Sequence, residues 1–162
     1  MPKIDLTKLP PREGTNYPDA FKHVVKGREK TALGNAVDLT QFGVNLTRLK
    51  PGAASALRHW HQNEDEFVYI LAGELVLIED DGETIMRPGD CAGFKANVAH
   101  GHHLVNRTER DALYLEVGTR APAEVYAHKL DLAAAADAAG FHDMFLAEHR
   151  LIASLVRVPE GV

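Results

Sequence analysis

His59-Trp60-His61, followed by Glu66 and then by Gly73, is the stretch that decides the expected fold of this chain. On an extended strand, side chains two residues apart project from the same face, so His59 and His61 direct two imidazoles into one space. A carboxylate from the next strand and a third imidazole would complete a set of three nitrogens and one oxygen, which suits Fe, Mn, Ni, Co, Zn or Cu. The stretch therefore predicts half of a metal site.

A second histidine-rich stretch supplies the third imidazole. Residues 89–106 read GDCAGFKANVAHGHHLVN and include His100, His102 and His103. If a strand already begins at His100, then His100 and His102 share one face. One of the two would then bind the metal, and the other would serve as a hydrogen-bonding neighbour or in proton transfer.

Short strands separated by turns dominate the chain from Phe21 onwards. Apolar residues alternate at 42–46 and 113–117, and apolar runs occupy 67–71 and 75–78. Asp81-Gly82 lies between two of these strands and predicts a hairpin. Many short strands with such turns indicate a barrel or a sandwich. In the strand at 113–117 we expect Leu113 and Leu115 to face inward, which would leave Tyr114 and Glu116 outside.

The two ends of the chain differ from its middle. Residues 1–20 are rich in Pro, Gly and charge and are expected to form an arm, whereas residues 21–130 form the β domain. Residues 131–162 are expected to form a helical extension. Asp131 would cap a helix that ends at Gly140, and Asp143 would cap a second helix that Pro159 ends.

Composition narrows the class of protein. The chain has 162 residues, which fits one domain with a sizeable core, and a net charge of −5. Its 18 Lys and Arg are scattered, so no surface for nucleic acid is indicated. It has neither a secretory leader pattern nor an apolar run long enough to span a membrane, so a cytoplasmic location is expected. Cys91 is the only cysteine, which excludes a cysteine-based metal site.

The two histidine-bearing stretches, within about residues 40 to 118, resemble the paired motifs of the cupin superfamily. The first motif runs from Gly52 to Gly73, and the resemblance implies His59, His61 and Glu66 as metal ligands. The second motif departs from the family pattern, because Lys95 stands where the family has Pro and Asn97 where it has Gly. Counting forward from Asn97 selects His100 as the last ligand, whereas counting back from Asn106 selects His102.

We choose His102, because turns tolerate a change of length better than strands do, and keep His100 as the alternative. Lys95, close to the expected mouth of the pocket, is a candidate for binding an anionic group of a substrate.

The resemblance implies an all-β fold, a double-stranded β-helix (jelly-roll) barrel with one divalent transition metal, such as Zn, Mn, Ni or Fe. It also implies a small-molecule substrate and a homodimer. The residues of the two motifs resemble those of bacterial cupins described as sugar-phosphate isomerases. We therefore expect a metal-dependent isomerase. An iron-dependent dioxygenase and a non-enzymatic cupin that binds a small molecule are the alternatives, because one fold serves many chemistries.

Overall fold

The computed structural model describes residues 3–17, 19–120, 144–147 and 150–153. The regular elements are mostly strands, with three short 3-10 helices, η1 (Leu6–Lys8), η2 (Asp19–Val25) and η3 (Asn35–Val37). The strands are β1 (Arg12–Glu13), β2 (Arg28–Ala32), β3 (Phe42–Leu49), β4 (Glu66–Ala72), β5 (Leu75–Glu79), β6 (Gly82–Met86), β7 (Cys91–Phe94), β8 (His103–Val105), β9 (Ala112–Thr119), β10 (Met144–Ala147) and β11 (Arg150–Ala153). None of the helices in these residues is long and apolar enough to cross a membrane.

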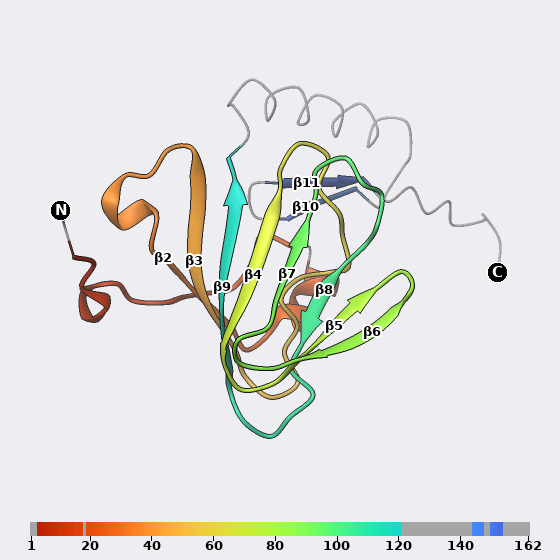
Figure 1. The fold of residues 1–162 in the computed structure, drawn as a ribbon, viewed down its shortest axis with the longest axis horizontal. Coiled ribbons are helices and arrows are strands. Elements are labelled where there is room, and N and C mark those ends of the chain that lie inside the picture. The colour runs from red at the N-terminus through yellow and green to blue at the C-terminus, as the bar shows by residue number, and fades with distance from the viewer. Residues whose placement is uncertain (1–2, 18, 121–143, 148–149, 154–162) are drawn as a thin grey trace.

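Two antiparallel sheets make up the body of the molecule (Figure 1). The larger sheet has the order β1-β2-β3-β9-β4-β7, and the smaller has the order β6-β5-β8. Outside these strands, single bridges join Ala54 to Val105 and His59 to His102. The predicted β architecture is confirmed at the level of antiparallel sheets with few helices. Strand pairing among the described residues does not close the two sheets into a barrel.

The hydrophobic core lies between the two sheets. The larger sheet contributes Leu49, Val68, Ile70, Ala112 and Tyr114, and the smaller sheet and its flanks contribute Leu75, Leu77, Met86 and Leu104. The strands predicted at 42–46, 67–71, 75–78 and 113–117 all form. The predicted hairpin also forms, with Glu79 of β5 paired to Gly82 of β6. Burial of these alternating apolar residues is what holds the layers together.

The inward face of β9 is the opposite of the one that we expected. Ala112, Tyr114 and Glu116 are buried, whereas Leu113 and Leu115 are only half-buried. The expectation assumed that the apolar residues of a strand face the interior. It was wrong because this end of the sheet borders a cavity lined by polar groups, so the polar residues of β9 face inward.

The second predicted C-terminal helix is also wrong over the residues that the structure describes. β10 and β11 pair antiparallel, with Met144 opposite Ala153 and Ala147 opposite Arg150. Short apolar runs such as these satisfy helix and strand spacing alike, so periodicity could not separate the two. The helix predicted from Asp131 to Gly140 lies outside the described residues. The boundaries of the arm, the β domain and the extension stay predictions.

Candidate metal centre

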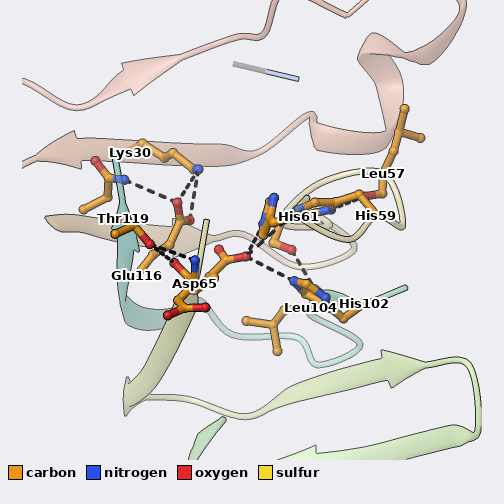
Figure 2. A network of polar contacts seen from close by, with 12 residues as sticks. Lys30, Leu57, His59, His61, Asp65, His102, Leu104, Glu116 and Thr119 are labelled. Atoms are coloured by element: carbon orange, nitrogen blue, oxygen red, sulfur yellow. Dashed lines mark hydrogen bonds and ion pairs between the residues drawn. The ribbon is translucent and has the colours of Figure 1, made fainter. Parts of the chain in front are cut away.

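The structure brings together the four side chains predicted as metal ligands. One ligand atom from each of His59, His61, Glu66 and His102 lies within 4.8 Å of all the others, and all four residues are buried. Glu66 Oε2 lies 2.7 Å from His61 Nε2 and 3.1 Å from His102 Nε2. His59 Nε2 lies 3.2 Å from His61 Nε2. Figure 2 shows the three imidazoles converging on one point.

This cluster fits a divalent metal ion. Nitrogen and oxygen ligands about 2.1 Å from one ion lie about 3 to 3.5 Å apart when the angle between them is between 90° and the tetrahedral value. The spacings of 3.1 and 3.2 Å fall in that range, whereas Glu66 Oε2 lies closer to His61 Nε2, at 2.7 Å, and farther from His59 Nε2, at 4.0 Å. Three imidazole nitrogens and one carboxylate oxygen are a donor set that transition metals accept. The geometry does not distinguish one such metal from another.

The imidazole of His59 is prepared to act as a ligand. Its Nδ1 lies 2.7 Å from the carbonyl oxygen of Leu57, so Nδ1 carries the hydrogen and donates it. This contact leaves the Nε2 lone pair directed at the cluster, as in metal sites where an outer hydrogen bond fixes the tautomer. Burial lowers the pKa of His59 from 6.5 to about 3, against the opposing effect of the Glu66 carboxylate. The ring is therefore neutral at neutral pH.

Backbone pairing holds the two ligand-bearing segments side by side. The N–H of His102 donates to the carbonyl of His59 at 2.8 Å, and the N–H of His59 donates back at 3.2 Å. The predicted strand around His59 is thus reduced to a single bridge. His59 and His61 still direct their rings to the same place, with their Nε2 atoms 3.2 Å apart.

A clamp on the outside of the cluster reinforces this pairing. Asp80 accepts a hydrogen bond from the backbone N–H of Gly101 at 3.0 Å and also pairs with the guanidinium of Arg58. Arg58 donates in turn to the carbonyl of Gly101 at 3.4 Å. The Gly101 N–H and the Arg58 charge lower the pKa of Asp80. Because Arg58 and Gly101 adjoin His59 and His102, the clamp ties the two ligands together through their neighbours.

Phe94 forms one wall of the cluster. Its ring stacks on the imidazole of His102, with 3.6 Å between centroids and 2° between planes. This contact restrains the orientation of His102 and keeps water away from one side of it.

Two other motif residues have structural roles. Asn106 is fully buried, and its amide donates to the carbonyls of Leu49 at 2.8 Å and Arg110 at 2.7 Å. Gly73 has a φ of +77°, and a Cβ there would lie 2.7 Å from the Cα of Ala112. Side chains are excluded at that position, which explains the glycine without any part in the chemistry.

The second motif keeps its geometry despite its unusual residues. Asn97 adopts a φ of +60°, a conformation that Asn tolerates better than most residues, and it donates its N–H to the carbonyl of His61 at 2.8 Å. The structure does not bring His100 or Lys95 into the cluster. His100 lies 3.6 Å from Glu79 and 3.3 Å from Asp81, and Lys95 is exposed.

A cavity of about 760 Å³ opens next to the cluster, and neither His100 nor Lys95 lines it. His59, Glu66 and His102 form part of its wall. A second group of polar side chains shares this cavity, namely Arg12, Arg28, Lys30, Asn45, Glu64, Tyr114, Glu116 and Arg120. The volume lies within the range of about 300–1,000 Å³ that is typical of small-molecule sites.

Sequence reasoning missed most of this second group. Glu64 stands in an acidic run beside Asp65 and Glu66, a pattern typical of a solvated turn, yet only 2% of it is exposed. Lys30 and Asn45 drew no attention, although both contact Glu116. A signal existed in β9, where polar Tyr114 and Glu116 alternate with apolar residues. We interpreted this alternation with the wrong face of β9 directed inward.

Comparisons with known proteins agree with this architecture. The family model of the cupin domain matches residues 45–118. A crystal structure of a sugar phosphate isomerase of the cupin superfamily from Silicibacter pomeroyi is 51% identical, with a TM-score of 0.73, and the match covers 75% of this chain and 77% of that one. Among curated proteins, no sequence match is found.

Two further solved structures are similar. A protein from Acidithiobacillus ferrooxidans, provisionally named a sugar phosphate isomerase, is 33% identical over 58% of this chain and 60% of that one, with a TM-score of 0.56. A predicted oxalate decarboxylase from Thermotoga maritima is 20% identical, covers 74% of this chain and 100% of its own, and has a TM-score of 0.57. At that identity the second structure shows the fold alone.

The two sheets and the buried cluster of three histidines and a glutamate define a β protein with a metal-type site in its interior. The chain belongs to the cupin superfamily.

Proposed function

We propose that this protein is a metal-dependent isomerase that acts on a sugar phosphate. The observation that carries the proposal is a single cavity with a metal-type cluster in its wall and further cationic side chains, Arg12, Lys30 and Arg120, around it. A sugar phosphate has both a carbonyl and hydroxyl pair, which a metal site recognises, and a dianionic group, which cations recognise.

Two arginines would bind the phosphate. Arg12 and Arg120 line the cavity and are also exposed, which places them where it opens to solvent. Arg120 donates to the side-chain oxygen of Asn35, whereas Arg12 forms no ion pair within the part of the chain that the structure describes. Guanidinium groups bind phosphate oxygens in a forked geometry, so these two side chains suit the anionic end of the substrate.

His59, His61, Glu66 and His102 would hold the metal. A bound divalent ion would act as a Lewis acid that polarises the carbonyl and hydroxyl pair of the sugar. Tyr114 also lines the cavity, and its hydroxyl is buried. Burial raises the pKa of Tyr114, so the phenol keeps its proton.

The relatives support this proposal through their names. The 51% identical protein from Silicibacter pomeroyi is described as a sugar phosphate isomerase, and so, provisionally, is the 33% identical one. Because cupins carry out several reactions on one scaffold, this support is secondary to the cavity itself.

Metal analysis followed by a substrate screen tests the proposal. Protein purified without added metal is analysed for its elements. It is then reloaded with Mn, Zn, Ni, Co or Fe and incubated with aldose phosphates of five and six carbons, such as ribose 5-phosphate and glucose 6-phosphate. Conversion to the ketose, seen by NMR, supports the proposal. Bound iron with oxygen uptake and no isomerisation would favour a dioxygenase instead. Binding without turnover of any compound would favour a non-enzymatic cupin.

A further inference from the structure

We propose that Glu116 is the base that moves the proton between the two substrate carbons, and that Lys30 and Asn45 hold it in position. This inference rests on the proposed isomerase function and deepens it, because it names the group that such a reaction requires. The three residues come from β9, β2 and β3, which are neighbours in the larger sheet.

The contacts of Glu116 show a carboxylate held firmly inside the cavity. Only 8% of the residue is exposed. Lys30 Nζ lies 3.2 Å from one carboxylate oxygen and 3.0 Å from the other, and the Asn45 amide donates to the first at 3.3 Å. A carboxylate offers about four lone-pair sites, and these contacts use three of them. One site is left to accept a proton from a substrate.

Strand register places Glu116 on the same face as the metal ligand Glu66. Glu66 of β4 lies opposite Gly118 of β9, and Glu116 lies two residues before Gly118, opposite Val68. Residues so related are diagonal neighbours on one face of a sheet, about 7–8 Å apart. Figure 2 shows Lys30 and Glu116 on one side and the three histidines on the other.

Glycines keep the space beside Glu66 open. Gly118 of β9 lies opposite Glu66 of β4 on one side and opposite Gly43 of β3 on the other. Both glycines line the cavity. Gly118 adds no side chain opposite Glu66, and a Cβ at Gly43 would lie 3.9 Å from Nε of Arg120. A substrate that contacts the metal ligands therefore has room to lie within reach of the Glu116 carboxylate.

A purely structural ion pair is a weaker explanation. Removing two charges from water costs free energy that the pairing only partly returns, so buried pairs are poor stabilisers compared with apolar residues of the same size. Lys30 and Glu116 meet on the wall of a cavity rather than in the packed core, whose members are apolar except for the hydroxyl of Tyr114. A role toward a ligand accounts for charged groups at this place.

The proposed step balances without any further reactant. The Glu116 carboxylate takes the proton from the carbon that bears the hydroxyl group, and the electron pair of that C–H bond forms the C=C bond of an enediolate. The π electrons of the former C=O bond move onto its oxygen. The carboxyl group then returns the proton to the former carbonyl carbon, the C=C electrons form that C–H bond, and the hydroxyl proton passes from one oxygen to the other as the new C=O bond forms.

Lys30 acts as a positioning residue in this scheme. Its ammonium group supplies a positive charge next to a carboxylate that has little contact with water, and its two contacts fix the plane of that carboxylate. Loss of Lys30 should therefore misplace the base without removing the metal.

The first test follows deuterium from solvent into the product. The metal-loaded full-length protein is incubated in D₂O with the aldose phosphate that it isomerises, and NMR measures deuterium on the carbon that receives the proton. A base that exchanges with solvent introduces deuterium there. Turnover with no deuterium in the product, together with wild-type activity of Glu116→Gln, would overturn the role of Glu116, while the isomerase function would stand. A wild-type protein that isomerises no sugar phosphate would overturn both.

The second test uses Glu116→Gln with Glu109→Gln as its matched control, because Glu109 is exposed and makes no ion pair among the described residues. We expect kcat to fall at least about 100-fold in Glu116→Gln, with metal content unchanged and KM within about threefold. The control should match wild type. An active Glu116→Gln variant would refute the role of Glu116 but not the proposed isomerase function.

Two further variants separate positioning from folding. Lys30→Gln should lower kcat by about tenfold or more, and Lys30→Arg should restore part of it, because it returns the positive charge. Glu116→Asp, which keeps the charge but shortens the side chain, should retain more activity than Glu116→Gln. Equal activity of Lys30→Gln and Lys30→Arg, at unchanged melting temperature, would contradict the positioning role.

Discussion

Where it borders the cavity, the larger sheet carries polar residues on its inner face and apolar residues on its outer face, whereas over the core its inner face is apolar as usual. On the inner face Glu66, Lys30 and Glu116 border a cavity, and Glu116 is only 8% exposed. On the outer face of β4, Phe67 is 42% exposed, and Tyr69 and Leu71 are exposed to a similar degree. Antiparallel sheets usually place apolar residues inward and polar residues outward.

This reversal has a physical meaning. Burying charged groups costs free energy unless they are paired or bind a metal, so an inner face that keeps them serves chemistry rather than stability. An outer face that keeps exposed aromatic and aliphatic side chains is a surface suited to association. The predictions below test the inner face first and the outer face last, in order of decreasing effect.

The largest effect is expected for the metal ligands. His61→Ala and His102→Ala should each abolish stoichiometric metal binding, because three of the four donors do not hold a divalent ion as the full set does. Elemental analysis after chelator-free purification measures the loss. His100→Ala is the matched control and should retain the metal. Metal loss in His100→Ala with retention in His102→Ala would reverse the assignment of the third histidine.

Acid should destabilise the metal-free protein through His59. Its pKa falls from 6.5 to about 3 on folding, so between these values the unfolded state binds more protons than the folded state. The free energy of unfolding should therefore decrease as the pH falls from about 6.5 toward about 3, by up to about 5 kcal/mol for this group.

Urea titrations of chelator-treated protein at several pH values measure this slope, and His59→Gln should flatten it. An unchanged slope in that variant would show that His59 is not the group responsible. With metal present, acid should also lower metal occupancy, because the imidazoles must be deprotonated to bind.

A smaller effect is expected from the clamp outside the cavity. Asp80→Ala removes the acceptor that joins Arg58 to Gly101, and we expect metal affinity to weaken by about tenfold, as when other groups outside the ligand set are lost. Competition with a chelator of known affinity measures the change. Asp81→Ala, one residue away and highly exposed, is the control. Equal metal affinity in the two variants would show that the clamp does not contribute to metal binding.

The smallest effect concerns the outer face. The homodimer is a prediction from the sequence, and light scattering should give about twice the chain mass of 17.8 kDa. If the apolar outer face forms the interface, Phe67→Ser should lower the mass toward that of one chain without loss of metal. Val98→Ser, at an exposed apolar residue outside the strands, should leave the mass unchanged. A wild-type protein that is monomeric at micromolar concentration would refute the dimer.

The four candidate ligands could be chosen from the sequence because their relation is mostly local. His59 and His61 lie two residues apart on extended backbone, and Glu66 begins the strand that follows. His102 required a choice among neighbouring histidines, and spacing from Asn106 selected the one that the structure places in the cluster. The Asn106 amide is buried and hydrogen-bonded to two carbonyls, which explains why the spacing from Asn106 identifies the ligand correctly.

The second polar group could not be chosen in this way. Lys30 and Glu116 are 86 residues apart, and they meet only because β3 lies between β2 and β9. Which face of β9 turns inward depends on that pairing, and a reversal of the face exchanges every residue of the strand between cavity and surface. The same dependence on context explains the error at β10 and β11.

By itself, the sequence indicated the family, the strands at 42–46, 67–71, 75–78 and 113–117, and the four residues of the candidate metal centre. Spacing of two along a strand and the residues of tight turns are local properties that a single chain carries in its order. The tertiary structure alone decided which strand faces meet across the cavity, and therefore that Lys30, Asn45 and Glu116 share it with the metal-type cluster. Contacts between distant strands depend on the register of the whole sheet, and no short stretch of sequence encodes that register.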